Sequence, residues 1–172
     1  MSAGERKRTE VRRTYLEMPS PGLLRPARSD EPGLRIERVV LCPASFYRFL
    51  YLEVGRAYRW EDRAKWTDDE IRAHLARPEI SLHLFSCRGA PAGYFELARC
   101  EDRSAEIAYF GLLPEFIGRG LGKHLLTCAT EEAFATGATR VWLHTCSLDD
   151  PAALPNYQKR GFLPFRTEMY WV

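Results

Sequence analysis

The chain has 172 residues, of which 45% are hydrophobic and 12% aromatic, enough for one compact domain with a sizeable core. Charged residues make up 28%, but the formal net charge is only +2, so the overall charge gives no reason to expect nucleic acid or a membrane surface as a partner. The five cysteines form no C-x-x-C pair, which argues against a disulfide framework and a zinc site and favours a reducing, cytoplasmic location.

The first 33 residues are predicted to form an N-terminal extension ahead of a domain over residues 34–172. Residues 1–10, rich in basic side chains, are expected to be a flexible lead-in rather than a nucleic-acid-binding arm. Residues 11–18 alternate with period two and predict a short strand, and residues 19–33 carry the prolines and glycines of a linker. No apolar run approaches the roughly 18 to 20 residues of a membrane helix, and the N-terminus lacks a secretory signal, so we expect no membrane association.

The rest of the chain predicts alternating strands and helices. The pattern of residues 34–40 indicates a strand, and that of residues 43–55 an amphipathic helix. Thr67 and Glu70 have the spacing of a capping box, which predicts a second helix that stops before Pro78. The remaining segments predict a hairpin, a third strand, a long helix, a strand, a short helix and a final strand: 80–84, 93–98, 105–113, 121–137, 141–145, 152–160 and 162–171. The order is β, β, α, α, β, β, β, α, β, α, β, an α/β arrangement.

A glycine-bearing loop, Gly118 to Gly122, joins a predicted strand to a predicted helix. Closely spaced glycines let backbone N–H groups approach an anion, and the helix dipole adds to the attraction. Arg119 and Lys123 can supply compensating charge, so the pattern is typical of a phosphate or diphosphate site; on these residues alone, a flexible connection is an equal alternative. A dinucleotide fingerprint is excluded because it would need glycine in place of Leu121 or Lys123.

The segment Leu112 to Gly122 resembles the acetyl-CoA-binding motif of the GNAT family of N-acetyltransferases. The family pattern is Gln or Arg, two residues, Gly, one residue, then Gly or Ala, and Gly120 and Gly122 occupy its glycine positions. Ile117 stands where the family has Gln or Arg, a departure that leaves the backbone amides available. The resemblance implies cofactor-binding contacts from Leu112, Leu113, Ile117, Gly118, Arg119, Gly120, Leu121, Gly122 and Lys123.

A second segment, Ala153 to Phe162, resembles the family arrangement A-x-x-x-Y-x-K-x-G-F, and the resemblance extends over residues 34–172. It implies a central mixed, twisted sheet of about six to seven strands flanked by about four helices, here with an extra N-terminal strand. It also implies direct transfer of an acetyl group from acetyl-CoA to an amine in a ternary complex without a metal, by a monomer or a homodimer. A non-catalytic acyl-CoA-binding module is the alternative from another class, because fold alone does not establish catalysis. The identity of the amine stays open.

The same resemblance assigns roles to individual residues. In the family fold the fourth core strand bulges and splays from the fifth, so that a backbone N–H binds the thioester carbonyl, and Leu112 matches that position. Tyr157 matches the tyrosine that protonates or hydrogen-bonds the leaving sulfur; its structural alternative is an aromatic anchor for the short helix. Glu106, at the start of the strand before the loop, is the candidate general base, with Glu96 and His144 as alternatives.

The amine is expected to bind near residues 51–66, where aromatic side chains lie among carboxylates. The residues concerned are Tyr51, Tyr58, Trp60 and Trp66 with Glu53, Glu61 and Asp62. A packed helix with a solvated face is the equal structural alternative. Further along the chain, Asp150 is expected to be an N-cap with Pro151 at the first helical position, and Cys146 a buried thiol rather than a nucleophile.

Overall fold

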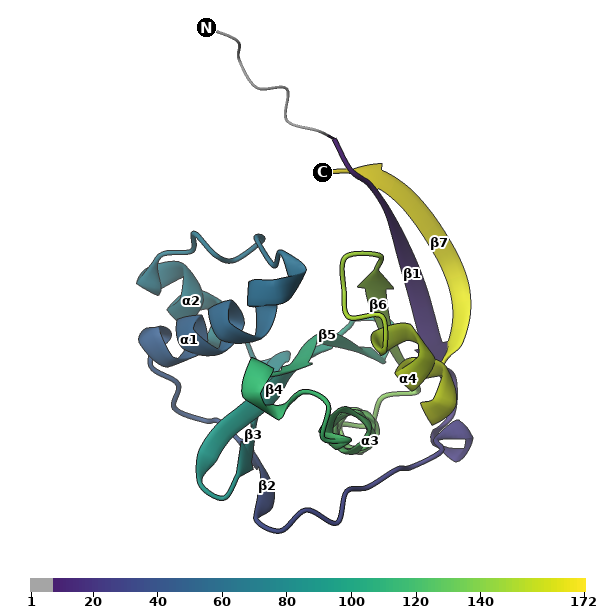
Figure 1. The fold of residues 1–172 in the computed structure, drawn as a ribbon, viewed down its shortest axis with the longest axis horizontal. Helices are drawn as coiled ribbons and strands as arrows, with labels where there is room; N and C mark the ends of the chain where they lie inside the picture. Colours follow the sequence, from purple (N-terminus) through teal and green to yellow (C-terminus); the bar gives the residue numbers. More distant parts are fainter. Residues whose placement is uncertain (1–7) are drawn as a thin grey trace, which may run out of the picture.

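The computed structural model describes residues 8–172 as a seven-stranded mixed sheet with helices on both faces (Figure 1). The strands are β1 (Glu10–Met18), β2 (Leu34–Arg38), β3 (Ile80–Cys87), β4 (Ala90–Arg99), β5 (Ser104–Leu112), β6 (Arg140–Cys146) and β7 (Leu163–Trp171). The helices are α1 (Ala44–Gly55), α2 (Asp68–Leu75), α3 (Leu121–Ala135) and α4 (Ala153–Arg160), with short 3-10 turns η1 (Pro21–Leu23), η2 (Arg56–Tyr58) and η3 (Pro114–Phe116). The predicted order of strands and helices and the α/β fold class are confirmed in the described part of the chain.

The N-terminal strand β1 lies inside the sheet. The strand order is β2-β3-β4-β5-β6-β1-β7, so β1 occupies the space between β6 and β7 and is antiparallel to both. Leu16 and Met18 of β1 are fully buried, so the chain before β2 contributes to the core. Of the flexible lead-in expected over residues 1–10, residues 1–7 lie outside the described residues, and Glu10 begins β1.

Two apolar cores lie on opposite faces of the sheet. Tyr94 and Phe95 are neighbours on β4, and because strand side chains alternate, they enter different cores. Phe95 packs with Leu125 of α3, whereas Tyr94 packs with Leu50 of α1 and Ile71 of α2. Figure 1 shows α1 and α2 on one side of the sheet and α3 and α4 on the other. Full burial of each such apolar side chain contributes about 1.5–3 kcal/mol.

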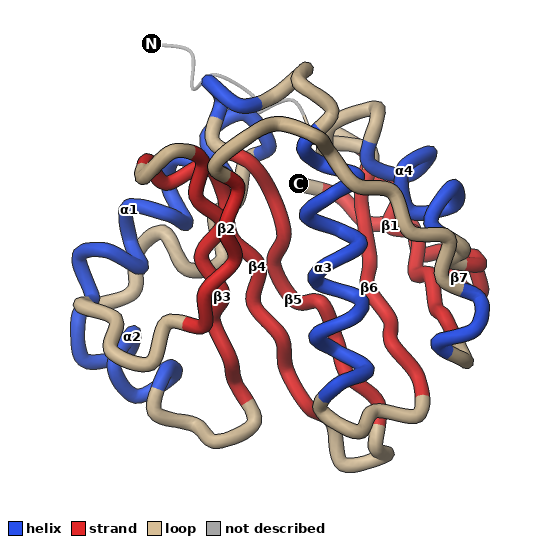
Figure 2. The backbone as a smooth tube through the Cα atoms, turned by 90° about the horizontal axis from the view of Figure 1, so that it is seen from below, coloured by secondary structure: helices blue, strands red, loops and turns tan. Residues whose placement is uncertain are grey.

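The linker between η1 and β2 crosses α3 (Figure 2). Within this segment the Ala27 N–H donates to Thr127 Oγ1 at 2.9 Å. Further along, the carboxylate of Glu31 forms an ion pair with Arg119, the residue between the first two glycines of the loop before α3. The proline-rich linker is therefore hydrogen-bonded along the first half of α3 and positions the glycine loop from outside.

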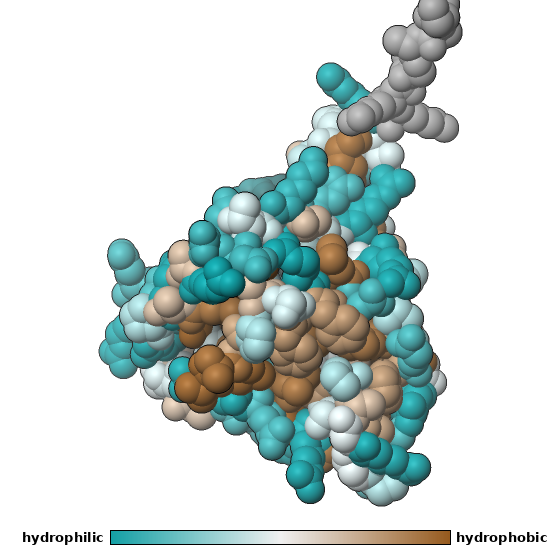
Figure 3. Space-filling view, turned by 90° about the vertical axis from the view of Figure 1, so that its left-hand side faces the viewer, coloured by the Kyte–Doolittle hydropathy of each residue, from teal (hydrophilic) through white to brown (hydrophobic). Residues whose placement is uncertain are grey.

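The face that carries α1 and α2 shows hydrophobic residues among hydrophilic ones (Figure 3). The exposed large apolar residues of this part of the chain include Phe49 and Leu52 of α1 and, just before that helix, Val40 and Leu41. Within residues 8–172, no helix combines the length and the apolar character needed to cross a membrane.

Candidate active site

β5 carries a bulge and then separates from β6. A register shift next to Glu96 in the β4–β5 ladder leaves Ala108 as an extra residue in β5. β5 pairs in parallel with β6 only over residues 104–106. Beyond this short ladder the two strands diverge, and α3 lies across the gap (Figure 2). The bulge and the divergence expected for this strand are present, with the bulge at Ala108.

The divergence leaves main-chain groups of β5 without a partner strand. The Leu113 N–H donates to Ala92 O at 2.8 Å, on the side of β4. Because peptide groups alternate in direction along a strand, those of Leu112 and Phe110 point the other way, toward the gap. β6 does not pair with β5 there, so an extended ligand can hydrogen-bond to these groups as an added strand would. The motif predicts such an unpaired main-chain group at Leu112. Phe110 provides a second one, which the sequence pattern did not indicate.

The glycine loop presents open backbone at the start of α3. Gly118 and Gly120 have φ angles of 80° and 72°, in the left-handed region that favours glycine. Apart from Gly118 itself and its two chain neighbours, no heavy atom of the described residues lies within 4 Å of the position that a Cβ would take there. Gly120 is the N-cap of α3, and within the part of the chain that the structure describes no side-chain hydrogen bond caps that helix. The free amides and the helix dipole together favour a bound anion.

One cavity of about 940 Å³ joins the glycine loop, the open edge of β5 and the start of α4. Nine predicted site residues line it: Glu106, Leu112, Ile117, Gly118, Gly120, Leu121, Gly122, Lys123 and Tyr157. Two others do not. Leu113 packs in the core beneath α1 and α2, and Arg119 pairs with Glu31 while its guanidinium lies 5.2 Å from the Phe116 ring centroid. Within residues 8–172, no group of three or more His, Cys, Asp or Glu side chains is placed to hold a metal ion.

Of the four carboxylates that line this cavity, Glu106 is the one without a hydrogen bond to another of residues 8–172. Its side chain is 22% exposed, and Oε1 lies 3.9 Å from Nε2 of His144, beyond hydrogen-bond distance. Burial raises the pKa of Glu106, and the negative charge of Glu96 adds to this effect. The positive charge of Arg63 opposes it but is outweighed. Burial and the charge of Arg13 lower the pKa of His144, so this imidazole is neutral at neutral pH. A carboxylate with a raised pKa is suited to accept a proton near neutral pH.

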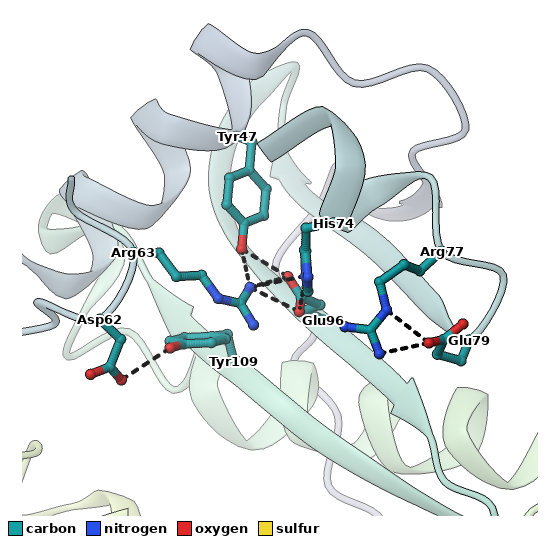
Figure 4. A network of polar contacts seen from close by, with 8 residues as sticks. All are labelled: Tyr47, Asp62, Arg63, His74, Arg77, Glu79, Glu96 and Tyr109. Atoms are coloured by element: carbon teal, nitrogen blue, oxygen red, sulfur yellow. Dashed lines mark hydrogen bonds and ion pairs between the residues drawn. The ribbon is translucent and has the colours of Figure 1, made fainter. Parts of the chain in front are cut away.

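Glu96, the alternative base, is held in a closed ion-pair network (Figure 4). It is fully buried and accepts a hydrogen bond from the Tyr47 hydroxyl at 2.9 Å. Arg63 and His74 Nε2 each lie 2.8 Å from its oxygens. Burial alone would raise the pKa of Glu96, but the His74 hydrogen bond and the Arg63 charge outweigh it and the pKa is lowered. Glu96 does not line the cavity, so it acts as a structural anion.

Replacing Arg63 with methionine is expected to lower the free energy of unfolding by about 3 kcal/mol, because Glu96 would stay buried without its charge partner. Arg72→Met is the matched control: its ion pairs are exposed, so the loss should stay below about 1 kcal/mol. Since the pKa of Glu96 is lowered by folding, its stabilising effect is present above about pH 4.3 and disappears in acid. Urea unfolding at neutral and acid pH measures both effects; equal losses in the two variants would contradict the assignment.

The residues around η2 line the other half of the cavity. Three of the residues predicted to lie near the amine, Tyr58, Trp60 and Asp62, line it. Tyr51 and Trp66 do not: Tyr51 is 1% exposed and stacks edge-on against aromatic neighbours, and Trp66 packs beside the α1–α2 core. Of the two glutamates in the expected set, Glu53 pairs with Arg56 and Glu61 is exposed, and neither lines the cavity. The expected aromatic and acidic set is therefore divided between the cavity wall, the core behind it and the surface.

The predicted N-cap at Asp150 is wrong, because the chain makes a further turn and Ala152 becomes the N-cap of α4. Asp150 Oδ1 instead accepts the Ala152 N–H at 2.8 Å, and Oδ2 accepts the Tyr58 hydroxyl at 3.2 Å. Tyr58 and Asp150 thus link η2 to the loop after β6 across the cavity. Cys146 is partly buried and lines the same cavity, and burial raises the pKa of its thiol, which disfavours a nucleophilic thiolate.

Comparison with protein families gives one match: the profile of the Acetyltransferase (GNAT) family matches residues 46–162, more than half of the chain. The matched region runs from α1 to the end of α4 and contains the glycine loop and most of the cavity lining. No curated protein matches the chain.

Several solved structures share the fold. A GCN5-related N-acetyltransferase from Kribbella flavida is 23% identical, with a TM-score of 0.66 over 95% of this chain and 58% of that protein. One from Sphaerobacter thermophilus is 15% identical, with a TM-score of 0.65 over 96% of this chain and 52% of that one. An acetyltransferase from Bacillus subtilis in complex with CoA is 25% identical, with a TM-score of 0.59 over 76% of both chains. The chain thus spans between half and two thirds of the length of the first two structures.

Proposed function

The chain belongs to the GNAT acetyltransferase family, and on this premise we propose that it transfers an acetyl group from acetyl-CoA directly to an amine bound in the same cavity. One observation carries the proposal: a single cavity contains the open glycine loop, the unpaired edge of β5 and the free carboxylate of Glu106. Its volume lies near the upper end of the usual range for small-molecule sites, which suits two substrates held together.

Each part of the cavity has a task in this reaction. The amides around Gly120 bind the diphosphate, and the β5 edge at Phe110 and Leu112 pairs with the pantetheine arm and polarises the thioester carbonyl. Glu106 accepts the proton that the amine must lose, directly or through water. The amine nitrogen then forms the new bond to the carbonyl carbon while the carbon–sulfur bond breaks. Tyr157 hydrogen-bonds the departing sulfur, which takes up the second proton that the nitrogen loses as the amide forms, and the products are an amide and the thiol of CoA.

The direct test is thiol release from acetyl-CoA in the presence of a panel of primary amines, with the acetylated product identified by mass. Release that depends on both the amine and the folded protein would support the proposal. Acetyl-CoA binding without release on any amine would instead identify a non-catalytic acyl-CoA-binding module. Calorimetric titration with acetyl-CoA separates the two outcomes.

Replacing Gly120 with glutamate is expected to weaken acetyl-CoA binding about tenfold or more. The glutamate would have to adopt the left-handed backbone φ of 72°, and its side chain would place a negative charge at the proposed diphosphate site. Calorimetry on the folded variant measures the effect. Gly137→Glu, at another positive-φ glycine that does not line the cavity, controls for backbone strain; equal affinity losses in both variants would remove the assignment.

A cytoplasmic location belongs to the same proposal. None of the five cysteines forms a disulfide in the structure, as a reducing compartment requires. A homodimer is a further proposal, and light scattering of the purified chain tests it.

A further inference from the structure

An arginine from the N-terminal strand reaches the amine half of the cavity. Arg13 of β1 is half-buried and lines the cavity, and its Cα lies opposite Cys146 of β6. The family resemblance gave no signal for it, because β1 precedes the matched region. It enters the site only because β1 is inserted beside β6.

The guanidinium of Arg13 has no ion-pair partner within residues 8–172. Its opposite residue on β7, Glu168, instead pairs with Arg166 and accepts the Tyr15 hydroxyl at 3.0 Å. The Arg13 guanidinium lies over the Tyr170 ring, 4.7 Å from the centroid, and its Nε is buried without a hydrogen-bond partner. A ligand does not reach this buried Nε, but a half-buried guanidinium that lines the cavity without an ion-pair partner in the described residues favours a ligand that brings an anion to its accessible N–H groups.

Arg13 lies at a definable distance from the proposed base. Glu106 is next to His144, and His144 and Cys146 lie two residues apart on the same face of β6. Arg13 is at the level of Cys146 and Glu106 at that of Trp142, four residues earlier on β6, so their Cα positions are separated by roughly 13 Å along the strands, with β6 between them. The charge of Arg13 contributes to the lowered pKa of His144, which lies between these two levels.

Carboxylates lie at both ends of this half of the cavity, but Asp149, at the Arg13 end, already accepts hydrogen bonds from the Thr145 hydroxyl and the Cys146 N–H. Asp62 and Glu106 supply carboxylates beside Trp60, where an amine is favoured. Arg63 also lines the wall, but its guanidinium is already paired with Glu96. Arg13 and Arg59 are then the cations of this half without an ion pair to another of residues 8–172; Arg59 is exposed beside η2, whereas Arg13 is half-buried and held by the sheet, which favours Arg13 for an anionic group of the acceptor.

We propose that the acceptor is a small amine that also carries an anionic group, and that Arg13 binds this group while the amine lies at Glu106. The inference rests on the proposed acetyl transfer and names the chemical class of its acceptor. A guanidinium binds carboxylate and phosphate through the same pair of N–H donors, so the chemistry of the anion is shared between these two groups.

The test compares acceptors that differ only in charge. Linear ω-amino carboxylates of increasing length, about three to ten carbons, which sample the separation left between the two side chains, are compared with their primary amides and with ω-aminoalkyl phosphonates. For the wild-type chain, kcat/KM should be about tenfold higher for an anionic series than for the amides. The series with the larger ratio shows whether the natural anion is a carboxylate or a phosphate.

Arg13→Gln should abolish this preference by lowering kcat/KM for the anionic acceptors about tenfold and leaving the amides unchanged. Arg13→Lys should restore part of it. Arg12→Gln is the matched control, because Arg12 is the exposed neighbour that does not line the cavity and should keep the full preference.

Two results would overturn the inference: a wild-type enzyme without preference for either anion, or a preference that survives Arg13→Gln. If no probe is acetylated, calorimetry with saturating CoA measures the affinity of the anionic probes and of their amides instead. The same preference for the anionic probes, lost in Arg13→Gln, is then expected in the affinities. Turnover of neutral amines without an anion preference would leave the proposed acetyl transfer intact and remove only this inference.

Discussion

Glu106→Gln is expected to lower turnover by roughly 10²- to 10⁴-fold while leaving acetyl-CoA affinity unchanged. An amine is mostly protonated at neutral pH, so the reaction needs a group that accepts its proton inside the cavity. Glutamine keeps the size and some of the hydrogen bonding of Glu106 but removes the basic carboxylate. Steady-state kinetics and calorimetric titration with acetyl-CoA measure the two quantities separately.

The pH dependence sharpens this prediction. Burial raises the pKa of Glu106, so the ascending limb of the wild-type rate profile should lie above the ordinary value of about 4.3 for a glutamate. In Glu106→Gln that limb should flatten, once the ionisation of the acceptor amine is taken into account and provided that chemistry limits the rate. Glu96→Gln is the comparison variant, because its carboxylate is closed in the ion-pair network and should affect stability rather than the limb.

Stability provides an independent check on the same variant. A carboxyl group whose pKa is raised by folding stabilises the folded state fully below its unfolded pKa, and this contribution is lost as pH rises through the folded pKa. At neutral pH the desolvated Glu106 carboxylate is therefore unfavourable, and the neutral glutamine should leave the protein at least as stable.

Wild-type turnover in Glu106→Gln, with loss of the ascending limb in His144→Gln, would transfer the role of base to His144.

Local pattern predicted most of the fold because each element carries its own signal. Thr67 and Glu70 form the expected capping box at the start of α2, and the period-two pattern of β1 is read from its own residues. The place of β1 between β6 and β7 is set by long-range pairing and core packing, which no local pattern contains. For that reason Arg13 could not be assigned to the site from the sequence.

The candidate site was predictable where main-chain groups rather than side chains form it. The loop residues Gly118 and Gly120 follow a recognisable spacing, and the cavity forms around them. Side-chain partners were less predictable: Arg119 pairs with Glu31 of the linker, a contact between segments far apart in the sequence. The choice between Glu106 and Glu96 likewise depended on the buried partners of Glu96, which the sequence does not reveal.

Tyr157→Phe is expected to lower turnover by roughly 10²- to 10³-fold with little change in acetyl-CoA affinity, because it removes a hydrogen bond to sulfur that forms as the carbon–sulfur bond breaks. The ring is 7% exposed and stands edge-on to Phe110 and Phe162, so phenylalanine preserves the packing. Steady-state kinetics under conditions where chemistry limits the rate, with calorimetry for affinity, measures the effect.

The pH profile separates the role of Tyr157 from that of the base. Burial, with a smaller contribution from the charge of Asp149, raises the pKa of Tyr157 well above its ordinary value, so the phenol keeps its proton between about pH 6 and 9. Tyr157→Phe should therefore lower the rate by the same factor across this range, whereas Glu106→Gln removes the ascending limb. A rate equal to that of the wild type would assign the ring to packing alone. A uniform loss that is relieved by an acyl donor with a more acidic leaving thiol would identify Tyr157 as the group that stabilises the departing sulfur, because a better leaving group needs less help from the phenol.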